Sequence, residues 1–176
     1  MKKITFLLSL IISISAKSQV INEWGVGPEI MYNIPIKGFG IGVRSHLHLS
    51  ERLFVSPQIS FYPGWNQIVE SYWGANINYN LNPSTKWGVF LNAGPYYNHW
   101  SNYESSDYSK AQQANFTAEF GGGIVKNFGC IRPFLEYRVN SKWWESNLRL
   151  GFNVYFGGCK GGKGRNNHLC PAYTSL

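Results

Sequence analysis

Apolar and polar residues alternate along most of this chain, and the stretch GFGIGVRSHLHLS (38–50) shows the pattern clearly. Its odd positions are apolar apart from Ser45. Its even positions hold glycines and polar residues that include Arg44, His46 and His48. A period of two is typical of a β-strand with two unlike faces. The apolar face of such a strand contacts either a soluble core or membrane lipid.

The same alternation, bounded by turn residues, predicts eight strands. They cover residues 24–34, 39–49, 53–62, 72–81, 87–97, 115–125, 131–139 and 147–156. Each is about 9–11 residues long, the length at which a tilted strand crosses a bilayer. Tight connections alternate with longer ones, of which 98–114 is the longest. The pattern predicts an all-β fold, a transmembrane up-and-down antiparallel barrel, with its tight turns and both termini on the periplasmic side.

The polar faces of the predicted strands carry arginine, glutamate and asparagine but no lysine. Arginine is better suited than lysine to paired, hydrogen-bonded confinement, so we expect these faces inside the barrel and the apolar faces toward lipid. An eight-stranded barrel is filled by its own side chains, which predicts a polar plug and not a pore. The expected lumen network comprises Glu29, Arg44, His46, His48, Glu119, Arg132, Glu136, Arg138 and Arg149.

Aromatic residues near the strand ends predict the girdles that mark the two membrane surfaces. The residues assigned to these girdles are Trp24, Tyr62, Trp73, Trp87, Tyr97 and Tyr155. Four prolines, however, fall inside predicted strands, where each removes a backbone donor. We expect bulges or small register shifts at Pro28, Pro57, Pro95 and Pro133.

The first residues have the pattern of a secretory signal peptide, in which Lys2 and Lys3 precede an apolar run and small polar residues follow. Its removal takes away three lysines from a chain of net charge +7, and the mild basicity that remains gives no reason to expect nucleic acid. No later stretch is long and apolar enough for a transmembrane helix. The expected organisation is a signal peptide (1–18), a barrel (19–156) and a tail (157–176).

The last predicted strand, RLGFNVYF, resembles the C-terminal signal by which outer-membrane barrels are recognised for assembly, through Arg149, Gly151, Val154 and Phe156. Together with the signal peptide and the eight strands, it makes residues 19–156 similar to the small OmpA/OmpX-type barrels. The Tyr- and Asn-rich composition resembles that of such proteins in Bacteroidota. The resemblance implies a bacterial outer-membrane location and contact with outer-membrane lipid. The tail departs from it, because such signals usually end the protein.

Enzymatic modification of lipid A and metal binding are two possible activities of such a barrel. Some eight-stranded barrels modify lipid A with a Ser/His pair, and His99 and Ser101 lie in the longest predicted loop beside Asp107. They lack motif spacing, so we expect no enzyme, and a lipid A-modifying enzyme remains the alternative. His46 and His48 have no visible third ligand, so we expect no metal and no cofactor.

Aromatic residues in the predicted loops mark either a partner surface or a thick outer girdle. The candidates for partner binding are Trp65, Trp100, Trp143 and Trp144. With no enzyme or pore expected, we interpret the protein as an accessory or structural subunit of a larger outer-membrane assembly, with outer-membrane or periplasmic partners.

The cysteines are expected at the periplasmic side, where oxidising conditions favour a disulfide. The pairing Cys159–Cys170 is slightly preferred and Cys130–Cys159 is its main competitor. A covalently held tail would serve to dock a partner.

Overall fold

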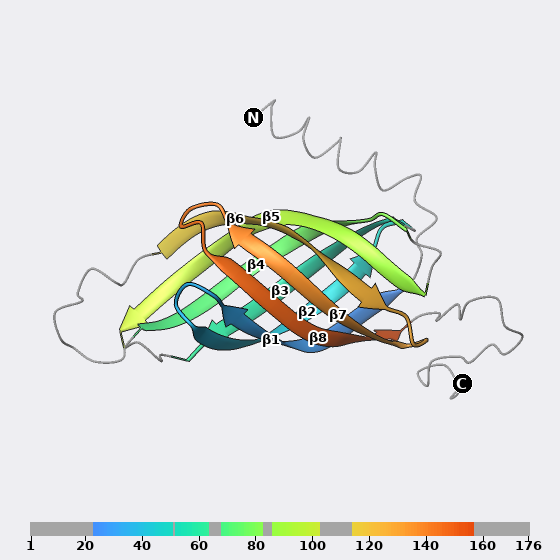
Figure 1. The fold of residues 1–176 in the computed structure, drawn as a ribbon, viewed down its shortest axis with the longest axis horizontal. Helices are drawn as coiled ribbons and strands as arrows, with labels where there is room; N and C mark the ends of the chain where they lie inside the picture. The colour runs from blue at the N-terminus through green and yellow to red at the C-terminus, as the bar shows by residue number, and fades with distance from the viewer. Residues whose placement is uncertain (1–22, 51, 64–67, 83–85, 103–113, 157–176) are drawn as a thin grey trace, which may run out of the picture.

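The computed structural model describes residues 23–50, 52–63, 68–82, 86–102 and 114–156. They form eight strands, which are β1 (Trp24–Asn33), β2 (Gly38–His48), β3 (Leu53–Tyr62), β4 (Ile68–Asn80), β5 (Trp87–Asn102), β6 (Ala114–Lys126), β7 (Ile131–Asn140) and β8 (Ser146–Phe156). Each strand pairs antiparallel with its neighbours in sequence, and β1 pairs with β8, so the sheet closes into a barrel (Figure 1). The predicted up-and-down barrel of eight strands is confirmed.

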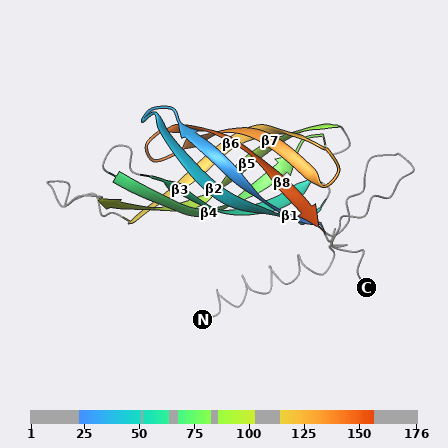
Figure 2. The ribbon, with the colours of Figure 1, turned by 90° about the horizontal axis from the view of Figure 1, so that it is seen from below.

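The two ends of the barrel differ. The turn end holds the start of β1, the end of β8 and the connections β2–β3, β4–β5 and β6–β7, as Figure 2 shows for the two terminal strands. Trp24 of β1 faces Phe156 of β8 there, with ring centroids 4.7 Å apart. The loop end holds the connections β1–β2, β3–β4, β5–β6 and β7–β8.

Two strands extend well beyond their predicted bounds, and both extensions are at the loop end. β4 begins at Ile68 and β5 ends at Asn102, and these two residues are paired. The sequence there is rich in Asn, Ser and Tyr, a composition that was interpreted as loop. These residues are nevertheless in a strand, because every residue from Asn98 to Asn102 pairs with a residue of β4.

The in-strand prolines interrupt the hydrogen-bonded ladders without moving the register. The β2–β3 ladder skips the positions around Pro57, the β4–β5 ladder those around Pro95, and the β1–β8 ladder those around Pro28, and each resumes in the same register. On its other side each of these prolines lies in a continuous ladder. Pro133 lies just beyond the last β6–β7 pair. The expected bulges and register shifts were therefore wrong. Each interrupted ladder is on one side of its proline only, and pairing with the other neighbouring strand holds the register.

Glycine precedes the proline at two of these interruptions, where adjacent backbones come close together. A Cβ on Gly27 would lie 1.7 Å from the backbone oxygen of Phe152, and one on Gly94 would lie 2.0 Å from that of Ala75. No other residue fits at such distances. The Gly-Pro pairs therefore mark places where neighbouring strands approach without a complete ladder.

Alternate side chains divide between an outer wall and an interior. The wall is apolar, with exposed Ile30, Ile41, Ile77, Leu91 and Leu150 spread around the barrel. The interior holds the buried glutamates and arginines together with many asparagines. This arrangement is the reverse of a soluble protein, in which the large apolar side chains are mostly inside. In the described ranges, no helix is long and apolar enough to cross a membrane.

Candidate functional site

Six charged side chains form a closed ring of ion pairs inside the barrel, which we call the ion-pair ring. Glutamate and arginine alternate around it in the order Glu29, Arg44, Glu136, Arg138, Glu119 and Arg149, and the last contacts the first. Each carboxylate therefore contacts two guanidinium groups, and each guanidinium contacts two carboxylates. The side chains are completely or almost completely excluded from solvent.

The contacts around the ion-pair ring are short. Arg44 Nη2 lies 2.7 Å from Glu136 Oε2, and Arg138 Nε lies 2.6 Å from Glu136 Oε1. Arg149 reaches Glu119 Oε2 at 3.0 Å and Glu29 Oε1 at 3.1 Å. Arg138 Nη1 lies 3.4 Å from Glu119 Oε2, and Arg44 Nε donates to Glu29 Oε2 at 2.7 Å. Equal numbers of acids and bases leave the ring neutral, so each buried charge in it is compensated.

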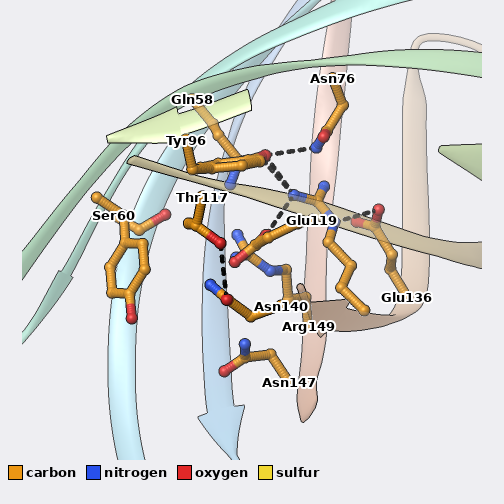
Figure 3. Close-up of polar contacts among 12 residues, drawn as sticks. Gln58, Ser60, Asn76, Tyr96, Thr117, Glu119, Glu136, Asn140, Asn147 and Arg149 are labelled. Atoms are coloured by element: carbon orange, nitrogen blue, oxygen red, sulfur yellow. Dashed lines mark hydrogen bonds and ion pairs between the residues drawn. The ribbon is translucent and has the colours of Figure 1, made fainter. Parts of the chain in front are cut away.

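The strands that supply no charge to the ring supply neutral partners. Arg138 Nη1 donates to Gln58 Oε1 of β3 at 3.0 Å and to the Tyr96 hydroxyl of β5 at 2.5 Å. The same hydroxyl accepts a bond from Asn76 Nδ2 of β4 at 2.5 Å (Figure 3). Asn92 of β5 donates to Glu136. The network thus connects side chains of all eight strands across the lumen.

A second layer lies toward the turn end and holds the histidines. His46 Nδ1 and the Tyr155 hydroxyl are 2.6 Å apart, and the His48 ring stacks on Phe54 with centroids 5.2 Å apart. Arg132 bonds Glu23 at 2.8 Å and covers the Tyr155 ring at 3.9 Å. His46, His48 and Arg132 therefore lie inside the barrel, as predicted. They do not belong to the ion-pair ring, although the sequence predicted a single network that included them. The described residues contain no group of three or more ligands arranged to hold a metal ion.

A third layer covers the ion-pair ring toward the loop end. Met31, Tyr62, Tyr72 and Tyr96 form a buried cluster, in which the Tyr62 and Tyr72 centroids are 5.7 Å apart. The Tyr62 hydroxyl donates to Asn147 Oδ1 at 2.9 Å, and Tyr72 donates to Glu70 Oε2 at 2.8 Å. Polar groups and aromatic rings thus fill this part of the lumen together.

Two tyrosines assigned to the outer girdles are interior residues. Tyr62 is 5 % exposed and Tyr155 is 3 % exposed, so their prediction as girdle residues was wrong. A signal was available in the sequence, because Tyr62 has the same parity as Gln58 on β3, and Tyr155 has the parity of Asn153 on β8. Position along the strand, and not aromatic character, decides which face these side chains occupy.

The tryptophan candidates divide into two kinds. Trp100 lies in β5, contrary to its prediction as a loop residue, and stacks on Trp143 of the β7–β8 turn at 5.3 Å. Trp144 is 73 % exposed, has a φ of 55° and contacts Phe120 edge-on at 6.5 Å. Trp65 lies outside the described residues. Trp144 is therefore presented at the surface, whereas Trp100 and Trp143 largely contact each other.

The residues considered for lipid A chemistry belong to strand β5. His99 pairs with Ser71 of β4 and is exposed, and Ser101 Oγ donates to the Val69 backbone oxygen at 3.4 Å. Their prediction as loop residues was therefore wrong. Asp107 lies outside the described residues. Within the described part of the chain, no acid orients the His99 imidazole.

Cys130 lies in the β6–β7 turn, where its backbone oxygen accepts a bond from Tyr155 N at 2.8 Å. It is the one cysteine among the described residues, and it is not free. Cys159 and Cys170 lie outside those residues, as do the signal peptide and the tail. Which cysteines pair therefore stays a prediction.

A closed eight-stranded antiparallel barrel with an apolar wall and a filled polar interior is the fold of the small outer-membrane barrels. The chain is similar to the N-terminal barrel domain of Pseudomonas aeruginosa OprF, with a TM-score of 0.61 and 14 % identity over 77 % of this chain and 98 % of that one. It is also similar to a de novo designed transmembrane barrel, with a TM-score of 0.55 and 14 % identity over 78 % and 98 % of the two chains.

A third similar structure is the Yersinia pestis outer membrane protein Ail in a phospholipid bilayer nanodisc, with a TM-score of 0.52 and 9 % identity over 77 % of this chain and 99 % of that one. At these identities the likeness shows the fold. No family model matches the chain, and no curated protein matches it.

Proposed function

We propose that this protein is a non-enzymatic barrel of a bacterial outer membrane that acts as a structural or accessory subunit of a larger assembly. The observation that carries the proposal is the combination of an apolar outer wall with the neutral ion-pair ring across the lumen. The wall suits lipid, and the ring leaves the interior without an open path. Function is then assigned to the outside of the barrel, at its loops, wall or tail.

The ion-pair ring argues against a transport role. A path through the lumen requires at least one buried ion pair to separate, and leaving a buried charge uncompensated costs about 3–5 kcal/mol. The layer of Met31, Tyr62, Tyr72 and Tyr96 covers the ring on the loop-end side. Both layers belong to the rigid strands, so neither is a loop that could swing away.

The loop end offers a contact surface for a partner. Phe116 is 78 % exposed and contacts Tyr97 at 5.2 Å, and Trp144 lies near Phe120 on the adjacent part of the wall. The φ of 55° at Trp144 is unusual for a bulky residue, and strained backbone of this kind is concentrated at functional sites. Exposed aromatic side chains on a rigid turn are typical of interaction hot spots. The tail, which follows β8, is the second proposed contact.

The orientation proposed for the barrel follows the usual arrangement of such proteins, with the tight turns and both termini in the periplasm. The loop end with Trp144 then faces outward from the cell, and the tail faces the periplasm.

The decisive experiment is purification of the full chain from its native membrane in mild detergent, followed by identification of the proteins that remain bound. We expect defined companions with wild-type protein, and their loss after Trp144→Ala combined with Phe116→Ala or after deletion of residues 158–176. Ile41→Ala, on the exposed outer wall at β2, serves as the control. A barrel that purifies alone from intact membranes would contradict the subunit role. A change in lipid A mass that depends on the protein would establish the enzymatic alternative instead.

A further inference from the structure

The outer rim of the turn end contains a lysine held between two aromatic rings. Lys126 is the last residue of β6 and pairs directly with Trp87, the first residue of β5. Its Nζ lies 4.7 Å from the centroid of the Trp87 ring and 4.8 Å from that of Phe128. Both rings are on the outer surface, 50 % and 59 % exposed. The ammonium group is thus fixed by two cation–π contacts at the edge of the apolar wall.

A second lysine lies beside this cluster. Asn127 N donates to the backbone oxygen of Lys86 at 3.0 Å, which places Lys86 next to the Lys126–Phe128 segment. The Lys86 side chain is exposed. Two positive charges and two aromatic rings therefore share one short part of the rim between β5 and β6.

The carboxylates of the described residues lie elsewhere. Glu29, Glu119 and Glu136 belong to the ion-pair ring, and Glu23 is bonded to Arg132. The remaining two, Glu70 and Glu145, are at the loop end, where they bond Tyr72 and Asn33. In the described part of the chain, therefore, no acid neutralises Lys86 or Lys126. The pair is therefore open to an anion other than these carboxylates.

We propose that Trp87, Lys126, Phe128 and Lys86 form a binding site for the phosphate of an anionic glycerophospholipid headgroup. Aromatic rings prefer the depth at which headgroups meet acyl chains, and lysine extends from that depth toward the phosphates. The two rings would contact the glycerol and upper acyl region, while the two ammonium groups bind the phosphate. The inference rests on the proposed membrane location, because it places the turn-end rim at the surface of one leaflet.

The loop end provides an internal comparison. Lys142 also lies over a tryptophan, with Nζ 5.0 Å from the Trp143 centroid. Its Nζ, however, donates to Asn115 Oδ1 at 2.6 Å, so the charge is already engaged by the protein. Lys142→Ala is therefore a matched control that removes a lysine–tryptophan contact without touching the proposed site.

The test measures lipid binding to the full chain in detergent by native mass spectrometry, with phosphatidylglycerol and phosphatidylethanolamine as probes. We expect one phosphatidylglycerol retained in preference to phosphatidylethanolamine. Each basic side chain near an anionic surface contributes about fivefold, so Lys86→Ala with Lys126→Ala should weaken binding about 25-fold. Lys142→Ala should leave binding unchanged. Equal binding by the double variant, or an equal loss in Lys142→Ala, would overturn the proposal.

Two further measurements complete the test. Glycerophosphoglycerol, the soluble headgroup, is added as a competitor, and competition as strong as that of the lipid would overturn the assignment to a membrane lipid. Heat-modifiable migration on gels reports whether each variant is a folded barrel. A folded barrel in the membrane fraction that shows no lipid preference refutes the lipid site alone, whereas a chain that is soluble without detergent refutes the proposed membrane role.

Discussion

Arg138 of β7 and Tyr96 of β5 are bonded across the lumen, with Nη1 and the phenolic oxygen 2.5 Å apart, although their strands are not neighbours in the sheet. The hydroxyl also accepts a bond from Asn76. Tyr96 therefore connects the ion-pair ring to the uncharged side of the barrel.

Tyr96→Phe should lower the free energy of unfolding by about 1–3 kcal/mol, because the buried Asn76 amide loses its hydroxyl acceptor and Arg138 Nη1 loses one of its three acceptors. Urea titration followed by tryptophan fluorescence in lipid vesicles measures the change. Tyr97→Phe is the control, since Tyr97 is on the outer wall beside Phe116. Equal stability of the two variants would show that the Tyr96 hydroxyl contributes nothing.

Glu119→Gln should be more harmful, with a loss of about 3–5 kcal/mol, because Arg138 and Arg149 then share a buried site with one carboxylate fewer. The same urea titration measures the loss. Glu145→Gln, which changes a carboxylate bonded to Asn33 at the loop end, should cost less than about 1 kcal/mol. A Glu119→Gln barrel as stable as wild type would refute the importance of the closed ring.

Gly94→Ala should impair folding, because the new Cβ would lie 2.0 Å from the backbone oxygen of Ala75. Backbone cannot move aside as a flexible side chain can. Gly38→Ala is the comparison, since its Cβ would first meet Ile36 Cδ1 at 3.2 Å. The fraction of heat-modifiable barrel after refolding into detergent distinguishes them, and similar yields would contradict the close approach at the Gly-Pro pair.

Reconstitution into planar bilayers should give negligible conductance, since the ion-pair ring and the tyrosine layer fill the lumen. Arg149→Ala removes the one ring side chain of β8, a fully buried arginine, and is the variant in which any leak should first appear. Large, stable channels in the wild-type protein would contradict the filled interior.

Strand number, closure and the choice of inner face follow from the sequence, because alternation with a period of two continues through β1, β3, β5 and β7 although each of these strands contains a proline. The contacts between side chains in the lumen, by contrast, cannot be predicted from the sequence. Arg44 meets Glu136 only because pairing of β1 with β8 brings β2 and β7 near each other, a relation that no local spacing encodes. The division of the polar residues into a ring and a histidine layer likewise depends on register.

The loop-end parts of β4 and β5 were predicted as loop for another reason. Ser71 and His99 have the composition of a loop, and their strand conformation comes from pairing with each other. Local propensity is weak in strands and is readily overridden by a partner across the ladder. The lipid A alternative places His99 in a loop, whereas the structure places it in a paired strand.

The ion-pair ring also has a consequence for how the barrel is made. Glu29 of β1 and Arg149 of β8 are 120 positions apart in the chain, and they meet only when the first and last strands zip together. Until β1 pairs with β8, Glu29 and Arg149 each have only one partner of the ion-pair ring, and Arg44 of β2 likewise lacks Glu136 of β7. Both contacts form when the first and last strands pair, so the ion-pair ring stabilises the closed barrel and not the open sheet.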